Sequence, residues 1–379
     1  MKNFADKKLR IAVFCQTEFA IPPPRTMKDI YAPLWLVHYI AEELVARGHY
    51  VTLFAPSDSK TKGRLISDNL ISLANSKEFA PYYKQVTELD QEKFFWQLAG
   101  RNAAIDQYDY LFLSRLYQMA SKGKFDVIYI SMIGMRPLPF AATVDIPTVC
   151  TIHAAPDPLT VQFFTKYKKR YPQLHFVGIS KKQTEVAPEI FTDVVYNGID
   201  LDAFSFNPKP DNHLLFSGRI SREKGAVEAI EVAKKAGIPL QIYGRHTEDP
   251  YWHKEISPQL NSSIEYKGLL PYWEIPPIYQ RAKATLVPIN WEEPFGLVMV
   301  ESMACGTPVI AFRRGSVPEI IEDGVNGFIV NNVDEMAEAV KNIDKIDRRE
   351  VRKNVERRFS KKAMVDGYEK IFYKVAEST

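Results

Sequence analysis

Short apolar runs alternate with amphipathic segments along nearly the whole chain. Residues 10–15 form the first apolar run, of the buried-strand type, and residues 50–55 form the next. Between them a helical spacing holds until Gly48, at positions Leu34, Val37, His38, Ala41, Leu44 and Val45. A strand, a helix and a second strand in this order favour parallel pairing through a right-handed crossover. The chain is therefore predicted to begin with a β-loop-α-β unit.

The alternation continues in two halves. In the first we expect helical material over residues 88–122 and strands at residues 126–131, 148–153, 175–180 and 194–196. An Asn- and Pro-rich cluster at residues 207–212 then predicts a boundary. Beyond it we expect strands at residues 214–217, 240–243, 264–266, 285–289, 309–312 and 327–330, and helices at residues 226–236, 278–282 and 317–321. Amphipathic helices at residues 334–343, 349–359 and 360–376 follow, so the pattern predicts two doubly wound α/β units.

A loop at residues 291–296 leads from the strand at 285–289 into an apolar helix that begins at residue 296 or 297 and ends at Gly306. The first N–H groups of a helix lack intrahelical partners and the helix dipole is positive there, which favours an anionic or hydroxyl-rich ligand. Glu293 precedes this helix and Glu301 lies more than one turn inside it. The two carboxylates either bind two parts of one ligand, or Glu293 is a helix-start acid and Glu301 a solvated or salt-bridged residue on the helix face.

The composition adds bounds to this picture. The 379 residues suit two domains of ordinary size, and 46% hydrophobic with 25% charged residues is typical of a globular protein. A formal net charge of +3 argues against a nucleic-acid partner, because such a partner calls for a broad basic face.

Cys15, Cys150 and Cys305 are far apart and lie in apolar runs, which favours buried thiols over a disulfide framework or a metal cluster. The start of the chain shows no secretory leader, and no run approaches the ~20 apolar residues of a membrane span. We therefore expect a cytoplasmic protein.

Two further segments carry candidate chemistry. Arg219 and Lys224 follow a strand end and precede a helix, and together they offer a planar fork and a point charge to a phosphate. The alternative is a solvated surface turn. His153 ends the strand at 148–153, where its ring, with an ordinary pKa near neutrality, suits hydrogen bonding to a ligand in the cleft. The alternative there is a structural histidine.

Residues 293–311, EPFGLVMVESMACGTPVIA, closely resemble the E-x7-E signature of retaining GT-B glycosyltransferases, specifically those of family 4. In that family the first Glu contacts the donor sugar and the second holds the nucleotide ribose. The resemblance implies these roles for Glu293 and Glu301. It also implies that the backbone of Phe295, Gly296 and Leu297 supports the sugar and its phosphates.

Other segments extend the resemblance. Residues 217–225, SGRISREKG, match the motif G-R-x-x-x-E-K-G, whose Arg and Lys bind the donor diphosphate, so Arg219 and Lys224 take that role by resemblance. His153 matches the T-x-H position beside the reacting sugar. The implied catalytic set is therefore His153, Glu293, Arg219 and Lys224. Residues 194–200 and 315–319 resemble a family hinge and a G-x-x-P-E loop, and each is as well explained as a structural turn.

The resemblance also implies an architecture. We expect the α/β GT-B fold, in which two Rossmann-like domains face each other across a cleft. Residues 1–200 would form the acceptor-side domain and residues 201–360 the nucleotide-sugar-binding domain. The last helix, residues 361–379, would cross back and pack on the first domain.

The function implied is retaining transfer of a hexose from a nucleoside-diphosphate sugar to an acceptor hydroxyl, in glycan, glycolipid or glycoside synthesis. UDP-sugars are the favoured donors and GDP-mannose is next. No cofactor is expected, and no metal, because no D-x-D pair stands in an obvious metal loop. The alternatives are a non-catalytic nucleotide-sugar-binding protein and a GT-B sugar epimerase.

The chain departs from the family pattern in one place and carries one unexplained patch. Family members usually have a glycine pair near the first long helix, whereas residues 16–33 contain no glycine. Side chains such as Arg25, Lys28 or Tyr31 are expected to replace it, or the acceptor is unusual.

Residues 163–170 mix aromatic and basic side chains, which fits peripheral contact with an anionic membrane or a solvated helix face.

Overall fold

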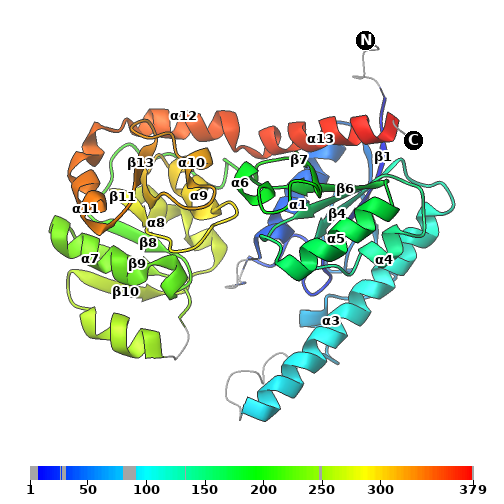
Figure 1. The fold of residues 1–379 in the computed structure, drawn as a ribbon, viewed down its shortest axis with the longest axis horizontal. Helices are drawn as coiled ribbons and strands as arrows, with labels where there is room; N and C mark the ends of the chain where they lie inside the picture. The colour runs from blue at the N-terminus through cyan, green and yellow to red at the C-terminus, as the bar shows by residue number, and fades with distance from the viewer. Residues whose placement is uncertain are drawn as a thin grey trace.

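The computed structural model describes residues 7–25, 27, 31–79, 91–132, 134–246 and 250–377, with only the backbone of residues 91–98 and 132. Two parallel sheets lie side by side, each covered by helices (Figure 1). The first has seven strands in the order β3-β2-β1-β4-β5-β6-β7. Its strands are β1 Arg10–Phe14, β2 Tyr50–Phe54, β3 Arg64–Ile66, β4 Val127–Met132, β5 Thr148–Ile152, β6 Leu174–Gly178 and β7 Phe191–Val194.

The helices of the first half join these strands. They are α1 Ala32–Ala46, α3 Gln91–Ala120, α4 Leu138–Ala141, α5 Pro158–Arg170 and α6 Lys181–Thr184. Strand β1 pairs in parallel with β2, with Arg10 opposite Tyr50, so the predicted β-loop-α-β unit is confirmed. The prediction missed β3, whose three residues are too short to show a period.

Two strand ends differ from the prediction. Strand β6 ends at Gly178, because Ser180 leaves the sheet to cap α6, where its side chain accepts a hydrogen bond from the N–H of Gln183. Strand β7 lies earlier than residues 194–196, since Val194 pairs with Gly178 and is already its last residue. The apolar side chain of Val195 instead packs in the core, where the chain begins to leave the first domain.

The second sheet has six strands in the order β10-β9-β8-β11-β12-β13. They are β8 Leu214–Ser217, β9 Leu240–Tyr243, β10 Ile264–Gly268, β11 Ala284–Val287, β12 Val309–Phe312 and β13 Gly327–Val330. Its helices are α7 Ala226–Ala236, α8 Pro276–Arg281, α9 Leu297–Ala304, α10 Val317–Ile320, α11 Val333–Asn342 and α12 Arg348–Arg358. The second α/β unit is confirmed, and its strands and helices lie within a few residues of the predicted ones.

Helix α13, Lys361–Glu377, continues the line of α12 and crosses back over the first domain (Figure 1). Its buried face carries Met364, Tyr368, Ile371, Phe372 and Val375. The hydroxyl of Tyr368 lies 2.8 Å from Oγ1 of Thr151 on β5, and its ring lies 5.1 Å from that of Tyr129 on β4. The predicted return of the last helix to the first domain is therefore confirmed.

The chain crosses between the domains twice, and the two crossings run side by side. Ile199 forms a parallel bridge with Ser360, in which the N–H of Ile199 donates to the carbonyl oxygen of Phe359 and the N–H of Lys361 donates to that of Ile199. A Cβ on Gly198 would lie 2.4 Å from the Ser360 carbonyl oxygen, so this close approach requires glycine. In such sheets ligands bind beyond the carboxyl ends of the strands, and His153 after β5 and Gly218 after β8 line one cavity between the domains.

Candidate functional site

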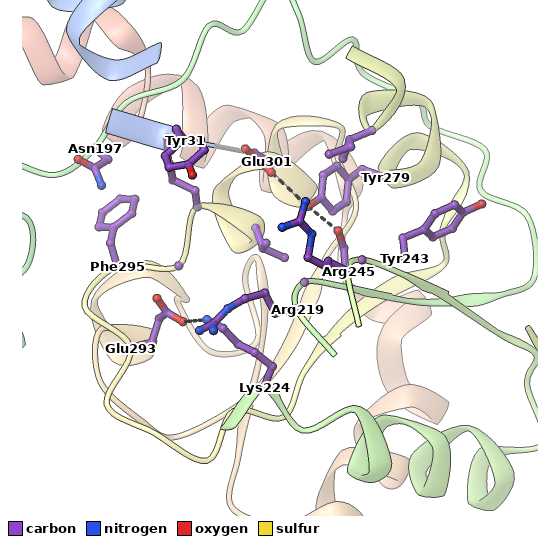
Figure 2. A pocket seen from close by; sticks show the side chains of 18 of the residues that line it. Tyr31, Asn197, Arg219, Lys224, Tyr243, Arg245, Tyr279, Glu293, Phe295 and Glu301 are labelled. Carbon is purple, nitrogen blue, oxygen red and sulfur yellow. Dashed lines mark hydrogen bonds and ion pairs between the residues drawn. The ribbon is translucent and has the colours of Figure 1, made fainter. Parts of the chain in front are cut away.

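A cavity of about 550 Å³ lies between the two domains and is lined from both sides (Figure 2). The first domain contributes Tyr31, Ala32, Pro33, Leu36, His153, Ile179 and Asn197. The second contributes, among others, every donor-site residue predicted from the sequence: Arg219, Lys224, Glu293, Phe295, Gly296, Leu297 and Glu301. The structure thus gathers the whole predicted set around one cavity, and it brings His153 to the same space from the opposite domain.

Glu293 and Lys224 form an ion pair in this cavity. The Lys224 Nζ lies 2.5 Å from Oε2 of Glu293 (Figure 2). The indole N–H of Trp291 donates to the same oxygen at 3.1 Å. The Lys224 ammonium also lies 4.8 Å from the centre of the Trp291 ring. Both charged side chains are largely shielded, with 21% and 14% of their surfaces exposed. The cation and the carboxylate therefore hold each other in place.

Helix α9 begins where the sequence predicts. Gly296 precedes it with φ of +79°, and a Cβ there would lie 2.6 Å from Cε of Met299. A left-handed residue with no room for a side chain favours glycine, and it turns the loop sharply into the helix. The start of α9 and the Glu293 side chain consequently border the same part of the cavity.

Residues 315 and 316 form hydrogen bonds with the loop before α9. Gly315 donates its N–H to Oε2 of Glu292 at 2.9 Å. Ser316 donates its N–H to the carbonyl oxygen of Glu293 at 2.9 Å and its hydroxyl to that of Phe295 at 2.7 Å. A Cβ on Gly315 would lie 2.3 Å from backbone atoms of Glu293. This part of the G-x-x-P-E segment therefore supports the loop that carries Glu293.

Glu301 lies deep in the second domain and is only 5% exposed. The hydroxyl of Tyr279 donates to its Oε2 at 3.2 Å (Figure 2). Burial raises the pKa of this carboxyl to about 7, because the charged form loses its hydration. The alternative of a solvated Glu301 is wrong, because the residue is buried and lines the cavity.

Arg219 reaches the cavity from the turn after β8 and remains 66% exposed. It pairs with Glu223 in the same segment, and neighbouring Arg222 turns away to pair with Glu255. An exposed guanidinium of this kind can exchange its carboxylate partner for an anionic ligand.

His153 follows β5 on the opposite wall. Its Nε2 lies 2.8 Å from Oγ of Ser131, and the amide of Gln183 donates to the carbonyl oxygens of Ile152 at 2.8 Å and Ala154 at 2.9 Å. Burial lowers the pKa of His153 to about 4. The expectation of a pKa near neutrality is therefore wrong, since desolvation keeps this imidazole neutral at physiological pH.

Several cavity residues were missed by the sequence analysis. They include Tyr243, Arg245, Ile275 and Tyr279. Arg245 follows the carboxyl end of β9 by two residues, and that position alone was a usable signal. Tyr279 lies in a short helix whose pattern resembles any buried helix, so nothing in the sequence marks it.

The three side chains expected to replace the missing glycine pair differ in their positions. Tyr31 lines the cavity, whereas the guanidinium of Arg25 lies 4.6 Å from the ring centre of Trp273. Lys28 lies outside the described residues.

The basic and aromatic patch at residues 163–170 is partly turned inward. Phe164 is buried, and the ammonium of Lys168 donates to the carbonyl oxygens of Glu189 and Ile190. Leu159 and Phe163 remain 62% and 39% exposed, with the Lys166 ammonium 5.7 Å from the Phe163 ring centre. In the described part of the chain, no helix has the length and apolar character needed to cross a membrane.

The described residues also hold no group of three or more His, Cys, Asp or Glu side chains placed to bind a metal ion.

Comparison with known proteins agrees with this architecture. The family model described as Glycosyltransferase Family 4 matches residues 35–203, and that described as Glycosyl transferases group 1 matches residues 200–364. The D-inositol 3-phosphate glycosyltransferase of Thermobifida fusca is 29% identical over 166 aligned positions, and the alignment covers 37% of this chain and 38% of that protein. The chain spans about half the length of the curated relatives it matches first.

Solved structures share the whole fold. Sucrose-phosphate synthase from Thermosynechococcus elongatus superposes with a TM-score of 0.70 at 16% identity, covering 97% of this chain and 99% of that one. The HepE protein of Anabaena, solved in complex with UDP and glucose, gives 0.64 at 18% identity, covering 96% and 100%. The two family models together run from residue 35 to residue 364. The chain therefore belongs to the glycosyltransferases of family 4, among the glycosyl transferases group 1, and its two facing α/β domains are the GT-B fold.

Proposed function

We propose that this protein transfers a hexose from a nucleoside-diphosphate sugar to an acceptor hydroxyl, with retention of configuration. The observation that carries this proposal is the single cavity that joins Glu301, the Glu293–Lys224 pair and the start of α9 to His153 of the other domain. A UDP-sugar is the favoured donor, with GDP-mannose next. The HepE structure, which contains UDP and glucose, supports this choice by similarity of fold.

In the proposed complex the nucleotide lies along the second domain. Glu301, buried beside Tyr279, would accept hydrogen bonds from the ribose hydroxyls. The start of α9, Lys224 and Arg219 would hold the diphosphate, because all three present positive charge or free donors to an anion. The diphosphate would compete with Glu293 for the Lys224 ammonium. Its arrival would release the Glu293 carboxylate for the hydroxyls of the hexose.

Catalysis would then rest on charge stabilisation. As the bond from the sugar to the diphosphate breaks, negative charge grows on the leaving group and the sugar gains oxocarbenium character. The acceptor oxygen would bond to the anomeric carbon, and its hydroxyl proton would pass to the departing diphosphate. Lys224, Arg219 and the α9 dipole would oppose the first charge, and Glu293 would hold the sugar in place. His153, neutral at physiological pH, would serve as a hydrogen-bonding group beside the reacting carbon. A reaction that needs no metal or other cofactor stays a prediction.

The acceptor would enter from the first domain, past Tyr31 and Asn197. It is a hydroxyl of a glycan, a glycolipid or a small glycoside. For a lipid acceptor, the exposed side chains of Leu159 and Phe163 beside Lys166 would rest on the membrane surface. We expect a cytoplasmic location, since the three cysteines are free and buried.

The decisive experiment is an incubation of the purified protein with UDP-glucose or GDP-mannose and a panel of acceptors. Nucleotide release and product mass report transfer, and NMR of the product reports its anomeric configuration. A new glycoside with the donor's configuration supports the proposal. Conversion of the sugar without an acceptor would point to an epimerase, and tight nucleotide binding without turnover of any donor would point to a binding protein.

A further inference from the structure

The four-residue helix α6 lies on the side of the first domain that faces the second (Figure 1). It is too short to be stable by itself, so its position depends on the bonds that other segments make to it. Two such sets of bonds come from opposite directions. One connects α6 to the backbone around His153, and the other connects it to the second domain.

Gln183 provides the first connection. Its side chain is 3% exposed and uses both ends of its amide. The oxygen accepts a hydrogen bond from the N–H of Ile179 at 2.8 Å, and the nitrogen donates to the carbonyl oxygens of Ile152 and Ala154. These two carbonyl groups flank His153, so Gln183 holds the backbone on both sides of the histidine.

Glu319 provides the second connection. It belongs to α10 in the second domain, and its carboxylate accepts hydrogen bonds from the N–H groups of Lys181 at 2.8 Å and Lys182 at 2.7 Å. The hydroxyl of Tyr196, near the crossing between domains, donates to it at 2.9 Å. A carboxylate that accepts two N–H groups at the start of a helical turn is held by charge-assisted bonds.

The segment that carries Glu319 also contacts the donor loop, residues 291–296, which precedes α9. Ser316, three residues before it, bonds the carbonyl oxygens of Glu293 and Phe295. A continuous series of bonds therefore runs from the Glu293 loop through Ser316 and Glu319 to α6, and from Gln183 to the backbone of His153.

We propose that Gln183 and Glu319 are positioning residues, which fix His153 in register with the donor loop across the cleft. The inference rests on the proposed function only in taking His153 and Glu293 as the groups that meet the sugar. Neither Gln183 nor Glu319 borders the cavity, so each acts through other residues. Loss of either contact leaves the nucleotide-binding residues in place and lets His153 move relative to them.

Gln183→Leu tests the first connection, and Gln173→Leu is its matched control. The Gln173 amide also donates to two carbonyl oxygens of the first domain, those of Ala141 and Val144, but Gln173 does not border the cleft. We expect Gln183→Leu to lower kcat by about 10–100-fold, the usual cost of a misplaced catalytic group, with affinity for UDP unchanged. Gln173→Leu should keep both kcat and affinity. Equal kcat in the two folded variants would overturn the proposal.

Glu319→Ala tests the second connection, with Glu185→Ala as control. Glu185 pairs with Lys182 at the surface and makes no contact with the second domain that the structure records. Glu319→Ala should lower kcat while UDP affinity holds, and Glu319→Gln, which keeps an acceptor oxygen, should recover part of the loss. A fall in UDP affinity equal to the fall in kcat would contradict a positioning role.

A readout independent of turnover separates this inference from the proposed function. Glu319 does not contact His153, yet Glu319→Ala should shift the ring signals of His153 in the NMR spectrum of the folded protein, as Gln183→Leu should. Unmoved ring signals in both variants would overturn the inference. Shifted signals in a protein whose wild type turns over no donor would keep it and reject the glycosyltransferase assignment.

Discussion

The Nζ of Lys224 lies 2.5 Å from Oε2 of Glu293, so the cation expected to hold a diphosphate and the carboxylate expected to hold a sugar neutralise each other. Both groups are largely shielded from water, which strengthens the attraction between them. A donor must exchange this contact for two new ones, one to each group. The ion pair therefore makes the two residues interdependent. The effects of their variants on UDP affinity are expected to differ in sign as well as in size.

Lys224→Ala should weaken UDP binding by about 1.5–3 kcal/mol, the range for a lost charge-assisted hydrogen bond. The loss also leaves Glu293 unpaired, and its charge would repel the diphosphate. Calorimetry with UDP in the presence of a chelator measures the effect. Lys235→Ala is a suitable control, because Lys235 is an exposed lysine of α7 that pairs with Asp334. Unchanged affinity, or binding that requires a metal, would argue against this diphosphate site.

Glu293→Gln should do the opposite for free UDP. Removal of the carboxylate releases Lys224 and lowers the negative charge near the diphosphate, so UDP affinity should hold or rise. Transfer should fall and discrimination among donor sugars should weaken, because the sugar loses a charged acceptor for its hydroxyls. The measurement compares UDP affinity with kcat for several donors. Glu265→Gln is the control, because Glu265 is a β10 residue whose side chain is 43% exposed. A parallel loss of affinity and kcat in Glu293→Gln would refute the assignment.

The fold was largely predictable because its signals are local. Buried parallel strands read as apolar runs, and the helix α7 begins and ends at the residues that the pattern predicts, Ala226 and Ala236. Strand β3 and the start of β7 were missed or displaced, because their residues are at most half-buried and do not form a continuous apolar run. The placement of α13 on the first domain depends on contacts more than 200 residues apart, such as Thr151 with Tyr368. Periodicity shows only that this helix buries one face.

The site was predictable to the extent that its residues lie in motifs. Glu293, Glu301, Arg219 and Lys224 were found in this way, but their mutual relations were not. The ion pair of Lys224 with Glu293 joins residues 69 positions apart. The raised pKa of Glu301 and the lowered pKa of His153 both come from burial, which depends on the assembled fold. The role of Glu319 in contacting α6 is likewise invisible before the two domains are brought together.

The buried carboxyl of Glu301 predicts a pH dependence of stability. Its folded pKa of about 7 exceeds the ordinary value of 4.5, so the folded state binds more protons than the unfolded state between these values. The contribution of Glu301 to the free energy of unfolding is fully present below pH ~4.5 and is lost as pH rises through about 7. Glu301→Gln should therefore gain stability relative to wild type as pH rises across this window.

Denaturant unfolding of wild type and Glu301→Gln at several pH values between 5 and 8 measures that difference. Other titrating groups, including His153, contribute equally to both proteins and cancel. Glu338→Gln, an exposed glutamate of α11, should run parallel to wild type. A constant difference between wild type and Glu301→Gln across this range would show that Glu301 is ionised throughout.

His153 is predicted to act by hydrogen bonding rather than by proton transfer. Its pKa of about 4 means that the ring is neutral above pH ~5. Protonation of the ring near physiological pH therefore costs free energy. His153→Ala should fold and bind UDP normally yet lower kcat by ~10²-fold or more, as expected for a polar group that acts in the transition state.

Two conservative variants distinguish the modes of action of His153. His153→Asn and His153→Gln retain an amide able to donate and accept hydrogen bonds, but they cannot exchange a proton. If His153 acts by hydrogen bonding, at least one of them should recover a large part of the kcat lost in His153→Ala. The pH profile of kcat between pH 5.5 and 8 should then keep the same shape in wild type and in that variant, since Glu301 titrates near pH 7 in both. If both variants are as slow as His153→Ala and lack a pH-dependent fall in kcat that wild type and Glu301→Gln both show, the ring exchanges a proton during turnover. Near-wild-type kcat in folded His153→Ala would instead assign His153 to the packing of β5 against β4, where its Nε2 already contacts Ser131.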